Sequence, residues 1–299
     1  MKFTGTVVQG NQLGREFGVS TANLDLASKP YLPEGIYFVR VFWQGKMLEG
    51  VMHFGRRISV DDQFSIEIHL LDFTGDLYGE ILQVEVCRRY RDILKFNTRE
   101  KLFSKIQEDR VAARKFFLRE EILARWKTVS DFERKQMAQR AAEKIASRKD
   151  FSSAEIVYAF APNDSEIPFV ERLAKQFSDK MWCFPRVDGG EMHFFPSSFS
   201  ALKLGKFGIL EPEGKLAAPA PDFIFVPALA ATKKGDRLGR GAGFYDRFLK
   251  SISVPKICVL PEFAVLKTLP ALPHDQRVDA VIGIGGITDY KLQITNGKA

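Results

Sequence analysis

The chain has 299 residues, of which 45% are hydrophobic and 27% charged. This composition is typical of a globular protein with room for two domains. No run of about 18 apolar residues occurs, which excludes a membrane-spanning helix, and the first residues lack the apolar region of a signal peptide. The three cysteines, Cys87, Cys183 and Cys258, are widely spaced, so neither a disulfide framework nor a zinc site is expected. These features predict a cytoplasmic protein with no membrane partner.

The formal net charge is +7, and most of the excess lies in residues 114–149, where Lys and Arg clearly outnumber Asp and Glu. Three interpretations are open. A basic helical region can bind nucleic acid, can face a polyanionic small molecule, or can be a solvated helix surface. Because a solvated surface or a small-molecule site is the commoner case, nucleic acid is not an expected partner.

Residues 1–97 have the pattern of a small all-β domain. Strand-like alternation or short apolar runs, separated by turn signals, occur at residues 35–43, 51–55, 66–73 and 81–90. Several short strands with no helix between them indicate a small barrel or sandwich. A helix is then expected to begin near Asn97 and Thr98.

From about residue 114 the pattern changes to alternating helices and strands. Ser130 and Glu133 form a capping signal that predicts the start of a second helix within the basic region. Strands are predicted at residues 155–161, 180–187, 222–229, 256–261 and 279–287, and helices at 170–177 and 244–252. This order predicts an α/β domain with a mostly parallel sheet flanked by helices, whose ligands would lie at the carboxyl ends of the strands.

The segment 237–249, RLGRGAGFYDRFL, has the composition of a phosphate-binding loop. Glycines allow backbone N–H groups to approach a polyphosphate, and arginines donate charged hydrogen bonds to its oxygens. A carboxylate such as Asp246 is the hard ligand that Mg²⁺ prefers. The segment follows the apolar run 221–229 and precedes the predicted helix, an order that favours anion binding. A glycine-rich surface turn is the alternative.

Two further segments carry residues suited to phosphoryl transfer. Thr21 and Asn23 stand two residues apart in an extended segment, so their oxygens point the same way and could bind Mg²⁺ or phosphate. Glu67 shares a strand face with His69 and could be a general base. The alternatives are an ordinary glycine turn before Thr21 and an outward-facing strand glutamate at Glu67. His69 is interpreted as a structural histidine.

The order GREFGVSTANLDL, PEGIY, GRR and EIHLLDFTGDLYGE over residues 1–115 resembles riboflavin kinase. The resemblance implies a six-stranded Greek-key barrel that transfers the γ-phosphoryl group of ATP to riboflavin, giving FMN and ADP. It implies Glu67 as the catalytic base and Thr21 as a Mg²⁺ ligand. The nucleotide-binding residues that it implies are Gly14, Arg15, Gly18, Thr21 and Asn23.

This sequence departs from that family at Val19-Ser20, where phenylalanine and proline are usual. Proline would stiffen the loop, so weaker nucleotide binding is one expected consequence. Bacterial riboflavin kinases are commonly joined to an adenylyltransferase that makes FAD. None precedes Met1 in this chain, so the expected product is FMN and not FAD.

Residues 115–289 resemble 5-formyltetrahydrofolate cyclo-ligase, also called methenyltetrahydrofolate synthetase. The resemblance rests on KFFLR (115–119), NDSEIPF (163–169), FPRV (184–187), the glycine-rich segment and PHD (273–275). It implies that Glu166 contacts the folate and that Asp246 and Asp275 bind Mg²⁺. The residues that it implies for ATP are Lys115, Arg119, Arg237, Gly239, Arg240, Gly241, Gly243 and Tyr245.

The implied reaction uses ATP to cyclise 5-formyltetrahydrofolate. The formyl oxygen attacks the γ-phosphorus, ADP leaves, the neighbouring folate nitrogen closes the ring, and phosphate departs to give 5,10-methenyltetrahydrofolate. Arg240 is the residue expected to stabilise the migrating phosphoryl group. Departures from the family are Ala228 and Ala242, where glycine is usual, and Ala231-Thr232, where phenylalanine and aspartate are usual.

The sequence therefore predicts a bifunctional enzyme with a kinase-like barrel at residues 1–114 and a cyclo-ligase-like α/β domain at 115–299. Mg²⁺ and ATP are expected at both sites. The alternative is an active cyclo-ligase whose N-terminal module binds flavin or nucleotide without turnover. The sequence predicts no oligomeric state.

Overall fold

The computed structural model describes residues 1–9, 21–205, 208–214 and 216–285. The chain divides into two compact units, with the division between Phe117 and Leu118. Within the described residues, no helix has both the length and the apolar character needed to cross a lipid bilayer.

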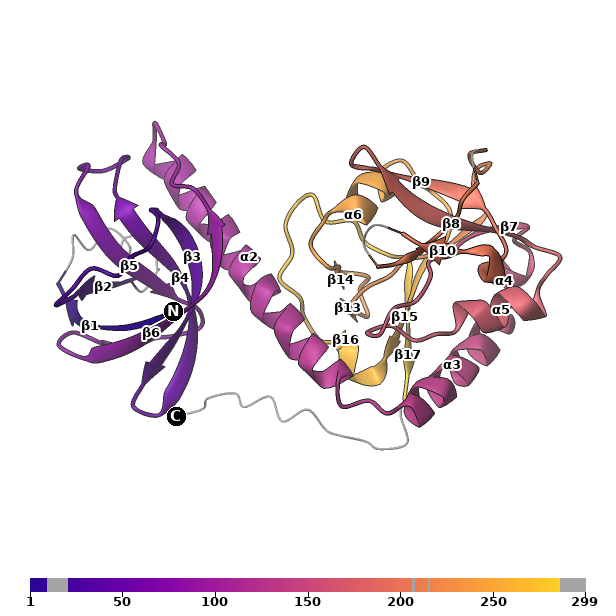
Figure 1. The fold of residues 1–299 in the computed structure, drawn as a ribbon, viewed down its shortest axis with the longest axis horizontal. Helices are drawn as coiled ribbons and strands as arrows, with labels where there is room; N and C mark the ends of the chain where they lie inside the picture. The colour runs from indigo at the N-terminus through magenta and orange to yellow at the C-terminus, as the bar shows by residue number, and fades with distance from the viewer. Residues whose placement is uncertain (10–20, 206–207, 215, 286–299) are drawn as a thin grey trace. The chain divides into compact units, whose positions relative to one another are not determined.

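The first unit is built on a closed six-stranded barrel (Figure 1). Its strands neighbour each other in the order β1-β2-β5-β4-β3-β6, and every pair is antiparallel. The strands are β1 (Lys2–Val8), β2 (Thr21–Asp25), β3 (Gly35–Trp43), β4 (Lys46–Arg56), β5 (Phe64–Leu70) and β6 (Ile81–Arg91). The predicted barrel is confirmed, and its closure leaves no sheet edge exposed.

The alternation of inward-facing apolar residues with outward-facing residues along each strand explains why the barrel forms. The interior is filled by Val, Ile, Leu and Met side chains, among them Val39, Val41, Met52, Ile68 and Leu82, all of which are fully buried. Burying each such side chain stabilises the fold by about 1.5–3 kcal/mol. The residues between them in sequence face outward, and part of that outer face packs against a helix.

Helix α2 (Arg99–Trp126) is continuous for 28 residues. In its middle, Ala113 and Phe117 are buried against Ile36, Phe38 and Val51 on the outer face of the barrel. Its last turns bury Ile122 and Trp126 in the core of the second unit. The helix therefore contributes side chains to both cores, and it continues through residues 114 and 115, where the sequence pattern suggested a domain boundary.

The second unit contains the predicted α/β sheet, and the mostly parallel arrangement is confirmed. The neighbour order is β17-β15-β12-β7-β8-β9, and all pairs are parallel except β8 with β9. The strands are β7 (Ile156–Tyr158), β8 (Met181–Asp188), β9 (Glu191–Pro196), β12 (Phe223–Phe225), β15 (Lys256–Pro261) and β17 (Ala280–Ile284). Figure 1 shows helices on either side of this sheet.

Helix α3 begins where the sequence predicted. Ser130 accepts from the Glu133 N–H while the Glu133 carboxylate accepts from the Ser130 N–H, a complete capping box. The helices of the second unit are α3 (Asp131–Ala146), α4 (Lys149–Ser152), α5 (Val170–Gln176) and α6 (Phe244–Leu249), with short 3₁₀ turns at Phe199–Ala201 and Glu262–Ala264.

The glycine-rich segment does not follow the sheet strand directly, which corrects the sequence interpretation. The apolar run 221–229 forms the three-residue strand β12 and then leaves the sheet. A small second sheet of β14 (Arg237–Leu238), β13 (Ala230–Thr232) and β16 (Val265–Leu266) intervenes, and β14 leads into the glycines. A separate two-stranded pair joins β10 (Lys203–Leu204) to β11 (Leu210–Glu211).

Candidate active sites

The barrel places Thr21, Asn23 and Glu67 next to each other. In the pairing of β2 with β5, Thr21 lies opposite His69 and Asn23 lies opposite Glu67. Ala22, Ile66 and Ile68 are buried in the barrel core, so these polar residues occupy the other face of their strands, as expected. The Thr21 hydroxyl and His69 Nδ1 are hydrogen-bonded at 2.9 Å. The structural role expected for His69 is thus observed.

The Glu67 carboxylate is held by an arginine. Arg57 Nη1 donates to Glu67 Oε1 at 3.3 Å, and Arg57 Nη2 donates to Asp61 Oδ2 at 2.6 Å. Arg57 is largely buried, whereas a fifth of the Glu67 side chain is exposed. The arginine therefore fixes one carboxylate oxygen of Glu67 while the side chain keeps access to solvent. Arg57 belongs to the GRR motif, but the motif alone does not indicate this contact with Glu67.

Two histidines lie beside Glu67 and are kept neutral. His53 on β4 lies opposite Glu67 on β5. Burial lowers the pKa of His69 to about 4 and also lowers the pKa of His53, although the negative charge of Glu67 opposes both shifts. Sequence reasoning missed His53, because only the strand register brings it to this position. Gly14, Arg15 and Gly18 lie outside the described residues.

In the second unit, Arg119 binds the glycine-rich segment. Its Nε donates to the Gly239 carbonyl oxygen at 2.8 Å. The Arg119 guanidinium also lies against Gly241, whose φ of 103° is one that residues with a Cβ rarely adopt. Lys115 is buried one helical turn before Arg119 on the same side of α2. The structure thus brings the predicted Arg119 to the predicted loop.

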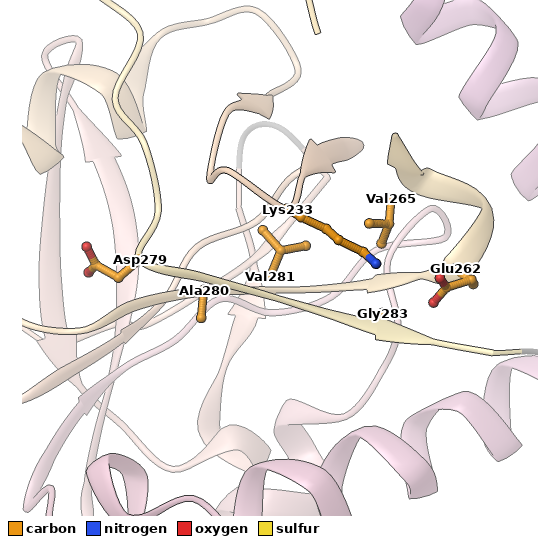
Figure 2. Close-up of a pocket in the computed structure, with 7 residues that line it drawn as sticks. All are labelled: Lys233, Glu262, Val265, Asp279, Ala280, Val281 and Gly283. Atoms are coloured by element: carbon orange, nitrogen blue, oxygen red, sulfur yellow. The ribbon is translucent and has the colours of Figure 1, made fainter. Parts of the chain in front are cut away.

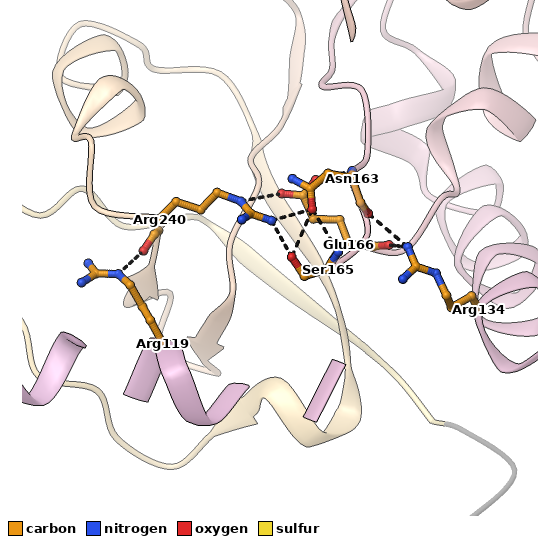
Figure 3. Close-up of polar contacts among 7 residues, drawn as sticks. Arg119, Arg134, Asn163, Ser165, Glu166 and Arg240 are labelled. Carbon is orange, nitrogen blue, oxygen red and sulfur yellow. Dashed lines mark hydrogen bonds and ion pairs between the residues drawn. The ribbon is translucent and has the colours of Figure 1, made fainter. Parts of the chain in front are cut away.

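Arg240 links the glycine-rich segment to the loop 163–166, which follows the carboxyl end of β7 (Figure 3). Its Nη2 donates to Asn163 Oδ1 and, at 2.5 Å, to Ser165 Oγ. Its Nε lies 3.8 Å from Glu166 Oε1. The residue predicted to stabilise phosphate therefore lies against the residue predicted to contact folate.

Glu166 is almost completely buried. Its Oε2 accepts from the Asn163 N–H at 3.0 Å, and burial raises the pKa of its carboxyl group despite this bond and the positive charges of Arg240 and Arg134. Arg134 is a further residue of this region that no local sequence pattern indicates. Its guanidinium donates to backbone carbonyl oxygens of the same loop (Figure 3).

Arg237 and Asp246 form a largely buried ion pair. Arg237 Nη2 donates to Asp246 Oδ1 at 2.6 Å, and the Gln276 N–H donates to the same oxygen at 3.0 Å. Asp275, the residue before Gln276, accepts from the Leu272 N–H through Oδ2 at 2.6 Å. The predicted metal carboxylates therefore lie in neighbouring segments. Within the described residues, no three His, Cys, Asp or Glu side chains gather into a metal site by themselves.

Tyr245 is half-buried beside this ion pair, and its hydroxyl oxygen is fully buried. The Arg237 guanidinium lies 6.0 Å from the centre of the Tyr245 ring. Burial and the negative charge of Glu166 raise the pKa of the tyrosine hydroxyl, which has no hydrogen-bond partner among the residues that the structure describes. An unpaired buried hydroxyl is costly, so this group is suited to bind a ligand atom. Helix α6 spans only six residues, so the arginines rather than the helix dipole provide most of the positive charge here.

The structure accounts for two departures noted in the sequence. Gly241 and Gly243 have φ values of 103° and 70°, whereas Ala242 between them is not in the left-handed region. Its methyl group is therefore not forced into a strained backbone. Thr232 Oγ1 accepts from the N–H groups of Lys234 and Asp236, so the threonine supplies the oxygen that organises this turn.

A separate hollow of about 490 Å³ lies along β17 (Figure 2). Its lining residues are Lys233, Glu262, Val265, Asp279, Ala280, Val281 and Gly283. Figure 2 shows the Lys233 side chain extending over the strand, with Asp279 and Glu262 toward opposite ends. None of the predicted site residues lines this hollow, so it is not the site described above.

Two family models match the chain. Residues 1–117 match riboflavin kinase, and residues 111–283 match the 5-formyltetrahydrofolate cyclo-ligase family. The bifunctional riboflavin kinase/FMN adenylyltransferase of Haemophilus influenzae is 35% identical over 115 residues, which are 38% of this chain and 37% of that protein. The Escherichia coli K12 protein of the same name is 38% identical over 116 residues, with the same coverage. The chain thus spans little more than a third of the length of these relatives.

Among solved structures, the 5,10-methenyltetrahydrofolate synthetase of Aquifex aeolicus superposes with a TM-score of 0.53 at 28% identity. The match covers 62% of this chain and 99% of that protein. The similarity therefore includes almost the whole of the Aquifex protein.

Proposed function

Since this chain belongs to the 5-formyltetrahydrofolate cyclo-ligase family through residues 111–283, and its first 117 residues match riboflavin kinase, we propose that it is a bifunctional enzyme. One activity phosphorylates riboflavin to FMN, and the other cyclises 5-formyltetrahydrofolate to 5,10-methenyltetrahydrofolate. Both reactions consume ATP. The observation that carries the proposal is that Thr21 and Asn23 lie beside Glu67 in the barrel, and that Arg240 lies against Glu166 in the second unit.

In the barrel, Glu67 removes the proton from the 5′-hydroxyl of riboflavin as that oxygen attacks the γ-phosphorus of ATP and the bond from this phosphorus to ADP breaks. Arg57 supports this role because it fixes Glu67 Oε1 and leaves the other oxygen to accept the proton. Thr21 and Asn23 lie on the adjacent strand, where their oxygens can face the phosphates. Phosphoryl transfer depends mainly on positioning and on neutralising charge, which is what this arrangement supplies.

In the second unit, the formyl oxygen of the folate attacks the γ-phosphorus of ATP and the bond to ADP breaks. The neighbouring folate nitrogen then closes the ring as phosphate leaves. Arg240 carries five N–H donors, so it can bind the transferring phosphoryl group while it stays anchored to Ser165. Glu166 lies next to it, on the loop where the folate is expected.

We further propose that Mg²⁺ accompanies ATP at the second site. Asp246 fits this role, because the hydrogen bonds from Arg237 and Gln276 both use Oδ1, and within the described residues no hydrogen bond uses Oδ2. A magnesium ion at a nucleotide site needs only one or two carboxylates besides phosphate oxygens. Such an ion neutralises phosphate charge. Asp275 is the proposed second carboxylate, and Thr21 is the proposed ligand at the barrel.

A paired assay tests the two assignments. FMN formation and the absorbance of the methenyl product are followed separately with Mg-ATP. Glu67→Gln removes the base, so FMN formation is expected to fall by a factor of about 100 or more, with cyclisation unchanged. Arg240→Gln removes a phosphate donor, so cyclisation is expected to fall about 100-fold, with FMN formation unchanged. Almost half of the Arg240 side chain is exposed, so this variant should fold.

Each variant is the control for the other activity. If either substitution disabled both reactions equally in a folded protein, the assignment of two separate sites would be wrong. Tight riboflavin binding without FMN formation by the unmodified protein would instead support a barrel that binds flavin without turnover.

A further inference from the structure

We propose that Arg134 is a positioning residue for the cyclo-ligase reaction, holding the loop 163–166 so that Glu166 faces the folate. This inference rests on the function proposed above for Glu166. Arg134 lies in the first turn of α3 and is remote in sequence from both the glycine-rich segment and Glu166. No catalytic motif of the sequence includes it.

The contacts of Arg134 are concentrated on the backbone of this loop. Its Nη2 donates to the carbonyl oxygens of Asn163 at 3.1 Å and Glu166 at 3.4 Å, and its Nη1 donates to that of Asp164. Figure 3 shows the guanidinium pointing into the loop from the side opposite Arg240. One planar cation thus connects three carbonyl groups, which a lysine ammonium cannot do with the same geometry.

The loop has its own internal bonds, but they do not by themselves determine where it lies. The Ser165 N–H donates to Asn163 Oδ1, and the Asn163 N–H donates to Glu166 Oε2. These bonds close the turn and orient the carboxylate within it. Arg240 connects this closed turn to the glycine-rich segment and Arg134 connects it to α3, so the position of the carboxylate depends on the helix as well.

Arg134 is itself held in place from two sides. Its guanidinium lies over the Trp126 ring at 5.4 Å, a cation–π contact with a residue that is only 3% exposed. The capping box of Ser130 and Glu133 fixes the start of α3 one turn earlier. The side chain therefore leaves the helix at a defined point and in a defined direction, as a positioning residue requires.

The test uses the full-length protein and three single variants. Arg134→Gln should raise the KM for 5-formyltetrahydrofolate about tenfold, which is the order expected for losing a charged hydrogen bond. The KM for ATP should change little, because Arg119 still holds Gly239. Arg134→Lys should give a smaller rise in the folate KM. Lys135→Gln is the matched control, since Lys135 is the next residue on α3, is exposed, and should leave both KM values unchanged.

A double-mutant cycle separates positioning from a general effect on stability. If Arg134 acts through Glu166, adding Arg134→Gln to Glu166→Gln should raise the folate KM by less than about twofold, because the interaction is already lost. Additive effects of the two substitutions would overturn the proposal. So would a lower melting temperature in Arg134→Gln with an unchanged folate KM.

Glu166→Gln alone separates this inference from the proposed function. If Glu166→Gln raises the folate KM but Arg134→Gln does not, only the positioning role fails. If Glu166→Gln leaves the folate KM unchanged, the folate contact assigned to Glu166 fails, and the role of Arg134 fails with it.

Discussion

His69 shows how one residue of the barrel connects stability to pH. It is buried, and its Nδ1 is hydrogen-bonded to Thr21, the residue proposed to face nucleotide phosphates. Burial disfavours the charged imidazolium and lowers the pKa of His69 to about 4. Because a neutral imidazole keeps one acceptor nitrogen and one donor N–H, the bond to Thr21 persists through the neutral pH range.

The barrel should lose stability as the pH falls below about 6.5. In that range the unfolded chain protonates His69, whereas the folded chain does so only near pH 4. Between pH 7 and pH 5 the difference amounts to about 2 kcal/mol of unfolding free energy. Hydrogen exchange of the β5 amides measures this loss. His69→Gln should remove most of it and leave only the smaller contribution of His53, whose pKa is also lowered. An equal pH dependence in the variant would contradict the explanation.

At the level of single residues, the sequence predicted those site positions that follow from local pattern. Alternation along β5 placed Glu67 and His69 on one face, and the extended segment placed Thr21 beside Asn23. Arg57 and Arg134 could not be found in the same way. Their partners lie 10 and about 30 positions away, and a basic residue that binds a loop has the same local pattern as a solvated one.

Among the elements, α3 depends strongly on its first turn. The turn is closed by the capping box of Ser130 and Glu133, and it carries Arg134. Ser130→Ala removes the oxygen that accepts from the Glu133 N–H, so α3 should lose about 1 kcal/mol. Hydrogen exchange of the α3 amides measures this. Ser147→Ala at the other end is the control, because within the described part of the chain that hydroxyl accepts no bond from a helix N–H and donates to the Lys144 carbonyl oxygen.

The predicted element boundaries differ from the observed ones at two places where the pattern of apolar residues gives no sign that an element ends or continues. Residues 226–229 are almost all apolar and buried like β12, yet they leave the sheet, because burial alone does not distinguish a strand from a buried connection. Similarly, α2 continues past residue 114 since its helical spacing is uninterrupted. Only the partners of its apolar side chains change along the helix. Phe117 contacts Phe38 on the barrel, whereas Ile122 is buried in the core of the second unit.

In the molecule as a whole, several of the Lys and Arg side chains that give residues 114–149 their positive charge are hydrogen-bonded within the protein. Arg119 donates to Gly239, Arg140 to Gly285 and Lys144 to Gly283, in each case at a backbone carbonyl oxygen. The last two bonds reach the end of β17 and the residue after it. None of the three interpretations drawn from the sequence included this role, because a charge count does not show which backbone groups lack partners. These contacts favour a structural use of the basic helices over nucleic-acid binding.

The proposed boundary between residues 114 and 115 has a consequence for the stability of the isolated barrel. Phe117 is 3% exposed and lies 6.5 Å from Phe38 between ring centres, and Phe116 lies 5.3 Å from the same ring. The Arg40 guanidinium also lies 5.5 Å from the Phe117 ring. A fragment that ends at residue 114 loses all of these contacts, whereas a fragment that ends at Trp126 keeps them.

We therefore expect fragment 1–114 to be less stable than fragment 1–126 by about 3 kcal/mol, the usual cost of removing a buried phenylalanine. Guanidinium unfolding of the two fragments measures the difference. Phe117→Ala in fragment 1–126 should reproduce most of the loss, whereas Tyr31→Ala, at a residue that is 96% exposed, should cost almost nothing. Equal unfolding midpoints for the two fragments would show that the barrel core is complete before Lys115, and the boundary inferred from the sequence would then be the better one.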